Sequence, residues 1–441
     1  MHIGQSLNIA LTDIESARSK RERPTNPDAF DLILRARSLL LHPMGPQEHA
    51  ERRALLEQAL LIDPNSVNAL TGLAYELMQA ERLYGQGEGD LDRAAKLLAQ
   101  AASISPDSIS VLNTTAYLAY AKNRYSEALP AYLRLLDEYP NAAGTYALVG
   151  YCQIFLGRFA EGISSIELAL RRDPFSPYNY DRLASIGWAM YALGRDEEAI
   201  SWTQRALAAV RSSFTVARAN FYSHIAVANA HLGRMSEAHT ALAEATRLWP
   251  YDTVRSHAPL DLSSNEYAEL TRRNQAALRH AGLRDHADED ADFGVPADGD
   301  LHLVIAGLTP TSAPGVTTIR TAELERLVDE KKPTVIDTLS YTWGLSISGA
   351  VGLNNAGHGG STSDAAQDRL RKKMQSLTNG DHGRPIVAMG WNSERFDGRN
   401  LALRLVSLGY TNVYWYRGGR EAWRSSGTSV PWPQRPAATQ A

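Results

Sequence analysis

The sequence predicts an N-terminal all-α solenoid of helical pairs, followed by a small α/β domain with a parallel sheet. Two observations predict it. Proline recurs at intervals of 34 residues in the first half of the chain, from Pro106 to Pro140 and from Pro140 to Pro174. After residue 315, short apolar runs alternate with helical stretches instead. A fixed period indicates stacked repeat units, whereas strand–helix alternation indicates a parallel sheet.

Each period in the first half is read as two helices joined at a glycine. Gly157, Gly194 and Gly233 occupy equivalent positions, and each is followed by an arginine. Glycine tolerates the positive φ that ends a helix, and the closing proline prevents the second helix from continuing. Small residues such as Gly150 and Ala199 recur where the two helices would cross closely. The spacing therefore predicts antiparallel helical pairs in close contact.

Five such pairs are expected from about residue 65 to residue 250. A degenerate pair precedes them, a capping helix over 265–281 follows, and residues 1–27 form a helical lead. The solenoid with its cap is therefore assigned to residues 28–282. The single cysteine, Cys152, falls inside a predicted helix, where we expect it to be a packing residue.

This pattern resembles the tetratricopeptide repeat in its spacing, its small residues and its closing proline. The resemblance implies a groove that binds a protein or peptide partner, and arrays of this kind also self-associate. The array is similar to those appended to bacterial class III adenylate cyclases, above all in the stretch RPTNPDA at 23–29. That similarity and the excess of arginine over lysine indicate a bacterial protein related to signalling.

Composition limits the other functions. The chain has 441 residues, a formal net charge of -4 and 44% hydrophobic residues, so neither nucleic acid nor a membrane surface is expected as a partner. No apolar run is long enough to span a bilayer, and the N-terminus lacks the features of a secretory signal. One cysteine can form neither an internal disulfide nor a thiolate metal site. We expect a cytoplasmic protein without metal or cofactor.

The second half begins with an acidic stretch at 283–314 that contains Gly and Pro and is read as a linker. The α/β domain is assigned to 315–428, and the Pro-rich tail at 429–441 is expected to be disordered. Strands are predicted at 334–338, 385–389 and 413–416, with helices at 321–330, 363–377 and 400–408.

This domain resembles the rhodanese family. Val335-Ile-Asp337 is similar to the family's first core strand, and Ile347-Ser-Gly-Ala350 stands where the family has Ile-Pro-Gly-Ala. Leu408 to Val413, followed by Gly418-Gly419 and Ala422-Trp423, matches the closing signature. In active members a cysteine follows the central strand and begins a loop of backbone N–H groups, which stabilise the thiolate.

Gly390 stands at that nucleophile position, and the domain contains no cysteine. The resemblance therefore implies a catalytically inactive, pseudoenzyme domain. Ser393 beside Glu394 is a weak alternative nucleophile. The loop remains a candidate site for a small oxyanion, with Asp337 in support, through Gly390, Trp391, Asn392, Ser393, Glu394, Arg395 and Arg399. In the competing interpretations, Arg395 pairs with Asp337 or Glu394, or Asp397 and Glu394 neutralise both arginines, and the loop is structural.

The leading functional hypothesis is a scaffold protein whose groove binds a partner and whose second domain is a regulatory or anion-binding module in signalling. One alternative is a sulfurtransferase-like or phosphatase-like enzyme that uses a group other than cysteine. The other is an accessory arm of an adenylate-cyclase-type signalling system.

Overall fold

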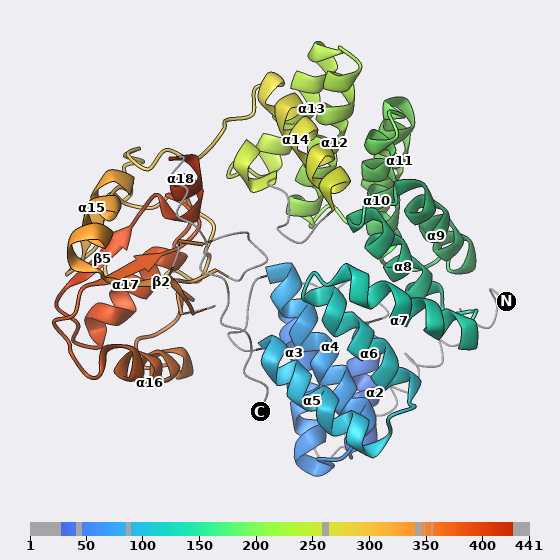
Figure 1. The fold of residues 1–441 in the computed structure, drawn as a ribbon, viewed down its shortest axis with the longest axis horizontal. Helices are drawn as coiled ribbons and strands as arrows, with labels where there is room; N and C mark the ends of the chain where they lie inside the picture. Colours follow the sequence, from blue (N-terminus) through green and yellow to red (C-terminus); the bar gives the residue numbers. More distant parts are fainter. Residues whose placement is uncertain are drawn as a thin grey trace. The chain divides into compact units, whose positions relative to one another are not determined.

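Consecutive antiparallel helices make up the first part of the chain (Figure 1). The computed structural model describes residues 28–40, 46–84, 90–257, 264–339, 346–347, 349–353 and 356–426. The expected helical lead and C-terminal tail lie outside these residues. The chain divides into two units, one of Met1–Pro250 with Leu262–Gly282 and one of Tyr251–Asp261 with Leu283–Ala441. No helix in the described part combines the length and apolar character that a bilayer span requires.

The described residues of the first unit form six helical pairs, in agreement with the predicted five and the degenerate pair before them. The pairs are α2 (Ala29–Leu39) with α3 (Pro46–Ile62), α4 (Val67–Tyr84) with α5 (Asp90–Ile104), α6 (Ile109–Ala121) with α7 (Tyr125–Glu138), α8 (Ala143–Phe155) with α9 (Phe159–Arg172), α10 (Asn179–Ala192) with α11 (Asp196–Ala209), and α12 (Thr215–His231) with α13 (Met235–Leu248).

Glycine allows the two helices of a pair to approach closely. A Cβ atom on Gly150 of α8 would lie 2.5 Å from Cγ1 of Ile166 and 2.8 Å from the carbonyl oxygen of Gly162, both in α9. In the next pair, a Cβ on Gly187 would lie 2.5 Å from Oγ1 of Thr203. Cys152 is fully buried in the core cluster of the earlier pairs, as a packing residue should be.

The turns within the last three pairs also have the predicted conformation. Gly157, Gly194 and Gly233 adopt φ values of 78°, 67° and 73°. After α8, the N–H of Gly157 donates to the carbonyl of Ile154 at 3.0 Å, and the N–H of Arg158 donates to that of Gln153 at 2.8 Å. These bonds satisfy carbonyl groups that would otherwise remain unpaired at the helix end.

The expected capping helix is present as α14 (Asn265–His280). It lies against α12 (Figure 1). Its Tyr267 ring also packs against Phe155 at the end of α8 and Trp188 of α10, with centroid separations of 5.3 and 4.7 Å. Helix α14 therefore contacts the first helices of the last three pairs.

A five-stranded parallel sheet forms the centre of the second unit. Its order is β1 (Thr317–Ile319), β5 (Val413–Tyr416), β4 (Ile386–Met389), β2 (Thr334–Asp337) and β3 (Val351–Gly352). The three predicted strands are the three central ones. The two edge strands were not predicted, because runs of three and two residues carry no periodicity.

Alternation along the strands assigns side chains to the two faces of the sheet. Ile336, Ala388 and Trp415 pack with α16 (Ala365–Thr378) and α17 (Asp397–Ser407). Val335 and Met389 pack with α15 (Thr321–Lys331) and α18 (Gly419–Ser425) on the other face. The sheet therefore has helices on both faces, the usual arrangement for parallel sheets.

Candidate functional site

The loop between β4 and α17, residues 390–396, is where the sequence places the functional site. Strand β4 lies at the centre of the sheet, and the loop leaves its carboxyl end. Ligands of open α/β sheets bind beyond the carboxyl ends of the strands. The loop therefore has the right position for a site, and its side chains decide what it can do.

Gly390 has no space for a side chain. A Cβ atom built on it would lie 2.0 Å from Oδ1 of Asp397 and 2.8 Å from the backbone nitrogen of Gly398. Its carbonyl accepts the N–H of Arg420 at 2.9 Å, which fixes the peptide against α18. A cysteine at this position would have to displace the start of α17.

Ser393 is not arranged as a nucleophile. It is fully buried, and its hydroxyl donates to the carbonyl of Asp288 at 2.7 Å. A serine nucleophile requires a base that accepts this proton. Glu394 does not take that role, because its carboxylate is ion-paired with the guanidinium of Arg284.

The two arginines of the candidate site, Arg395 in the loop and Arg399 in the first turn of α17, are balanced by acids of the same unit. Arg395 Nε lies 3.1 Å from Oδ2 of Asp397. Arg399 is fully buried and donates to the carbonyl of Asp300 at 2.9 Å and to Oδ1 of Asp298 at 2.7 Å. Burial is the largest single effect on the Asp298 carboxyl and raises its pKa, but the hydrogen bonds from Arg399 and the Asp300 N–H and the nearby positive charge together lower that pKa. Asp397 therefore pairs with Arg395, as one competing interpretation has it, but the partner of Arg399 is Asp298 and not Glu394.

Asp337 binds a different arginine from the one considered in the sequence. Its Oδ2 accepts from Nε and Nη2 of Arg420 at 3.0 and 2.7 Å. The Leu339 N–H and the Ser346 hydroxyl also donate to this carboxylate. Burial raises the pKa of the Asp337 carboxyl, while Arg420 acts in the opposite direction. One competing interpretation pairs Arg395 with Asp337 or Glu394; in the structure Arg395 lies against Asp397, while Asp337 and Glu394 bind Arg420 and Arg284.

The stretch read as a linker belongs to the second unit and contacts this loop. We call residues 283–309 the covering segment. Ala306 forms an antiparallel bridge with Arg395, the N–H of Phe396 donates to Ile305 at 2.8 Å, and that of Gly307 donates to Glu394 at 2.9 Å. The His302 ring stacks on Phe396 at 3.9 Å. The acidic segment differs from a solvated linker because its backbone carbonyls and carboxylates bind the buried arginines.

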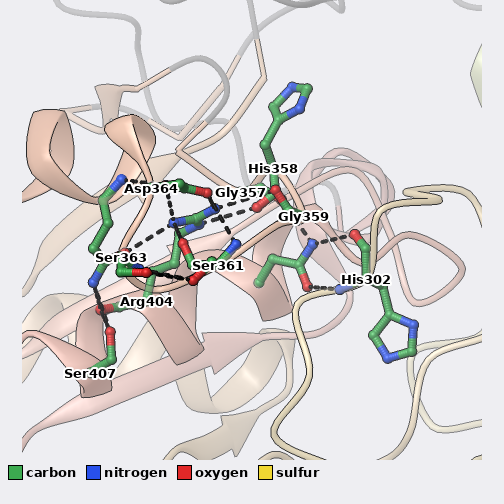
Figure 2. A network of polar contacts seen from close by, with 11 residues as sticks. His302, Gly357, His358, Gly359, Ser361, Ser363, Asp364, Arg404 and Ser407 are labelled. Carbon is green, nitrogen blue, oxygen red and sulfur yellow. Dashed lines mark hydrogen bonds and ion pairs between the residues drawn. The ribbon is translucent and has the colours of Figure 1, made fainter.

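A second network anchors residues 357–364 beside α17 (Figure 2). The guanidinium of Arg404 donates to the carbonyls of His358 and Ser361, both at 3.1 Å, and to Oδ2 of Asp364 at 2.8 Å. The hydrogen bond from Arg404 lowers the pKa of Asp364 well below its usual range. The imidazole rings of His302 and His358 extend away from this network (Figure 2). The network therefore has the geometry of a structural support.

Sequence reasoning missed Glu421, a buried acid in α18. Its Oε2 accepts from Nδ2 of Asn392 at 3.0 Å and from the N–H of Ala287 at 2.9 Å. The Thr253 hydroxyl also donates to this carboxylate. Glu421 therefore joins the loop, the covering segment and the residue before η1 (Val254–His257). Its place between Arg420 and Ala422 in the closing signature was the only sequence signal.

Residues 320–426 match the model of the rhodanese-like domain, and residues 86–150 and 143–176 match models of the tetratricopeptide repeat. The chain carries tetratricopeptide repeats and a rhodanese-like domain. No curated protein matches its sequence.

Several solved structures are similar at low identity. A chain of the APC/C hetero-tetramer Cut9–Hcn1 is 15% identical, with a TM-score of 0.45, over 60% of this chain and 46% of its own. Pseudomonas aeruginosa PilF is 17% identical, with a TM-score of 0.38, over 51% and 93%. PilW, a type IV pilus biogenesis factor, is 20% identical, with a TM-score of 0.40, over 51% and 94%. This chain thus spans less than half of the Cut9–Hcn1 chain.

Proposed function

We propose that this protein is an interaction scaffold whose tetratricopeptide array binds a protein partner and whose rhodanese-like domain transfers no sulfur. Tetratricopeptide repeats in general bind proteins, and stacked repeats offer extended surfaces for this. A role in bacterial signalling, expected from the resemblance of the array, and a cytoplasmic location, expected from the N-terminus and the single cysteine, are part of this proposal.

The observation that carries the proposal is the absence of space at Gly390. Sulfur transfer by the family mechanism requires a thiolate there, and the Cβ atom of any residue other than glycine would lie 2.0 Å from Asp397 Oδ1. The chain's only cysteine is buried in α8 of the other unit. Arg395 and Arg399 pair with Asp397 and Asp298, so neither charge is left to bind a small oxyanion.

A thiosulfate-to-cyanide sulfurtransferase assay on the purified full chain tests this proposal. We expect no activity above the buffer control. Cys152→Ser is the matched variant, because it removes the only thiol without touching the second unit. Activity that persists in Cys152→Ser after repeated purification would contradict the proposal, since it would require a sulfur acceptor other than cysteine.

A further inference from the structure

Helix α14 covers a surface that we call the first-helix face, formed by α8, α10 and α12. Ser264, the N-cap of α14, donates its N–H to the carbonyl of Phe155 at 3.2 Å. The Arg273 guanidinium donates to the carbonyl of Tyr191. Leu270 is buried in one apolar cluster with residues of all three helices, namely Ile154, Met190, Tyr191 and Ala228. A helix is therefore the shape that this surface accommodates.

The buried stripe of α14 is narrow and partly polar. Its members recur at helical spacing, and they are Leu270, Thr271, Asn274, Ala277 and Leu278, next to the half-buried Tyr267. Oδ1 of Asn274 is buried without a hydrogen-bond donor among the described residues. A buried unpaired acceptor weakens an interface, because water would satisfy it in the undocked helix. Docking of α14 is thus weaker than a fully apolar stripe would make it.

The segments that precede and follow α14 in the sequence are hydrogen-bonded to each other. The N–H of Val254 donates to the carbonyl of Arg284 at 2.9 Å, and the N–H of Arg255 donates to that of Asp285 at 3.1 Å. These residues belong to the second unit, whereas α14 between them belongs to the first. A released α14 would remain tethered at both ends. Tethering keeps its effective concentration high, so that it docks again when no competitor is present.

We propose that the first-helix face is the partner-binding surface of the scaffold, and that its partner contributes an amphipathic helix with a tyrosine and a leucine three residues apart. Helix α14 occupies the face as an internal competitor until the partner displaces it. Docking of one apolar helix face into a groove is a common mode of recognition. Occupancy by α14 reduces the apparent affinity for the partner, which is proportional to the fraction of molecules in which the face is open. This inference rests on the proposed scaffold function.

A fluorescent peptide with the sequence of residues 264–281 serves as the probe, and its binding to the full chain is followed by anisotropy. Tyr267→Ala in the protein removes the contacts with Phe155 and Trp188 while the face itself stays intact. We expect this variant to bind the peptide at least about tenfold tighter than wild type. Arg272→Ala is the control, because Arg272 lies on the exposed side of α14 and should leave binding unchanged. A peptide carrying Tyr267→Ala should bind no variant.

Peptide binding to Tyr267→Ala no tighter than to wild type would overturn the proposal and make α14 a permanent cap. If the Tyr267→Ala variant does not fold, amide hydrogen exchange of the wild-type protein tests the proposal instead. In wild type, α14 amides should exchange faster than those of α12, and equal rates would overturn the proposal. A concentration-dependent dimer that the peptide dissociates would also overturn it, because the occupant would then be a second copy of this chain.

Two glycines provide a matched pair for the exchange measurement. Gly157 and Gly194 have φ values of 78° and 67°, so alanine strains the backbone similarly at both. Only at Gly157 would the new Cβ lie 2.7 Å from Oγ of Ser264, whereas Gly194 has nothing within 4 Å. Gly157→Ala should therefore accelerate α14 exchange beyond Gly194→Ala, and equal acceleration would count against reversible docking. These results are independent of the sulfurtransferase assay, so failure here would leave the proposed absence of sulfur transfer unaffected.

Discussion

Gly390 makes a direct contact between the end of β4 and the start of α17. We predict that Gly390→Cys restores no sulfur transfer and lowers the free energy of unfolding of the second unit by about 1–3 kcal/mol, because an overpacked atom must displace its neighbours. The new Cβ would lie 2.0 Å from Oδ1 of Asp397. Urea denaturation and the thiosulfate assay together measure both effects.

Gly383→Ala is the control for this substitution. Gly383 is exposed, and a Cβ there would meet only Oδ1 of Asp381 at 3.4 Å. Its stability should match wild type. A Gly390→Cys protein that transfers sulfur and has wild-type stability would contradict this prediction, because the loop and the start of α17 would then accommodate the new side chain without cost.

Asp364 gives the second unit a dependence on pH. Its pKa in the folded chain lies below the ordinary value of 3.8, because Arg404 donates to the carboxylate. The ion pair therefore contributes its full stabilisation above pH 3.8, and this contribution decreases progressively as the pH falls from 3.8 towards the folded pKa. We predict that Asp364→Asn reduces the loss of stability between neutral pH and about pH 3. Denaturant unfolding at the two pH values measures this difference.

Asp368 supplies the comparison on the same helix. It pairs with Arg371 in an exposed position, where ion pairs contribute little. Asp368→Asn should leave the pH dependence as in wild type. If both variants reduced the acid-induced loss of stability equally, the Asp364–Arg404 ion pair would not be the source of that loss.

At the scale of elements, α8 contains two glycines with opposite expectations. Gly144 is exposed and a Cβ on it would have nothing within 4 Å, whereas one on Gly150 would lie 2.5 Å from Cγ1 of Ile166. We predict that Gly144→Ala stabilises the first unit by about 0.5–1 kcal/mol, because alanine loses less backbone entropy in a helix. Gly150→Ala should destabilise it by about 1–3 kcal/mol through overpacking. Denaturation curves of both variants test the pair, and equal signs would contradict the helix crossing.

Elements with a strong period could be predicted from the sequence. The six helical pairs follow from the recurring glycines and prolines, and the three central strands follow from their apolar runs. The position of the candidate loop after β4 also follows from the strand. Its chemistry does not, because the partners of Arg399 and Glu394 lie about a hundred residues away, at Asp298 and Arg284. Local patterns carry no information about which distant charge fills a buried site.

The covering segment and α14 show the same limit on a larger scale. Their local sequences predict a linker for the covering segment and a capping helix for α14. Their tertiary contacts depend on Arg417, which donates to the carbonyls of Glu289 and Thr309 at 2.8 and 2.9 Å, and on the packing of Tyr267. Backbone acceptors look the same in every sequence, so only the fold reveals that an acidic stretch supplies them.

At the scale of the whole molecule, each unit has its own apolar clusters, such as the one around Tyr120 and Tyr132 in the first and the one around Ile336 and Trp415 in the second. We therefore predict two transitions in calorimetric unfolding of the full chain. Gly150→Ala should lower only one of them and Gly390→Cys only the other, by about 2–4 °C for each kcal/mol lost. Distant substitutions act additively, so the double variant should show both shifts unchanged. A single transition that both substitutions lower would mean that the two units unfold as one.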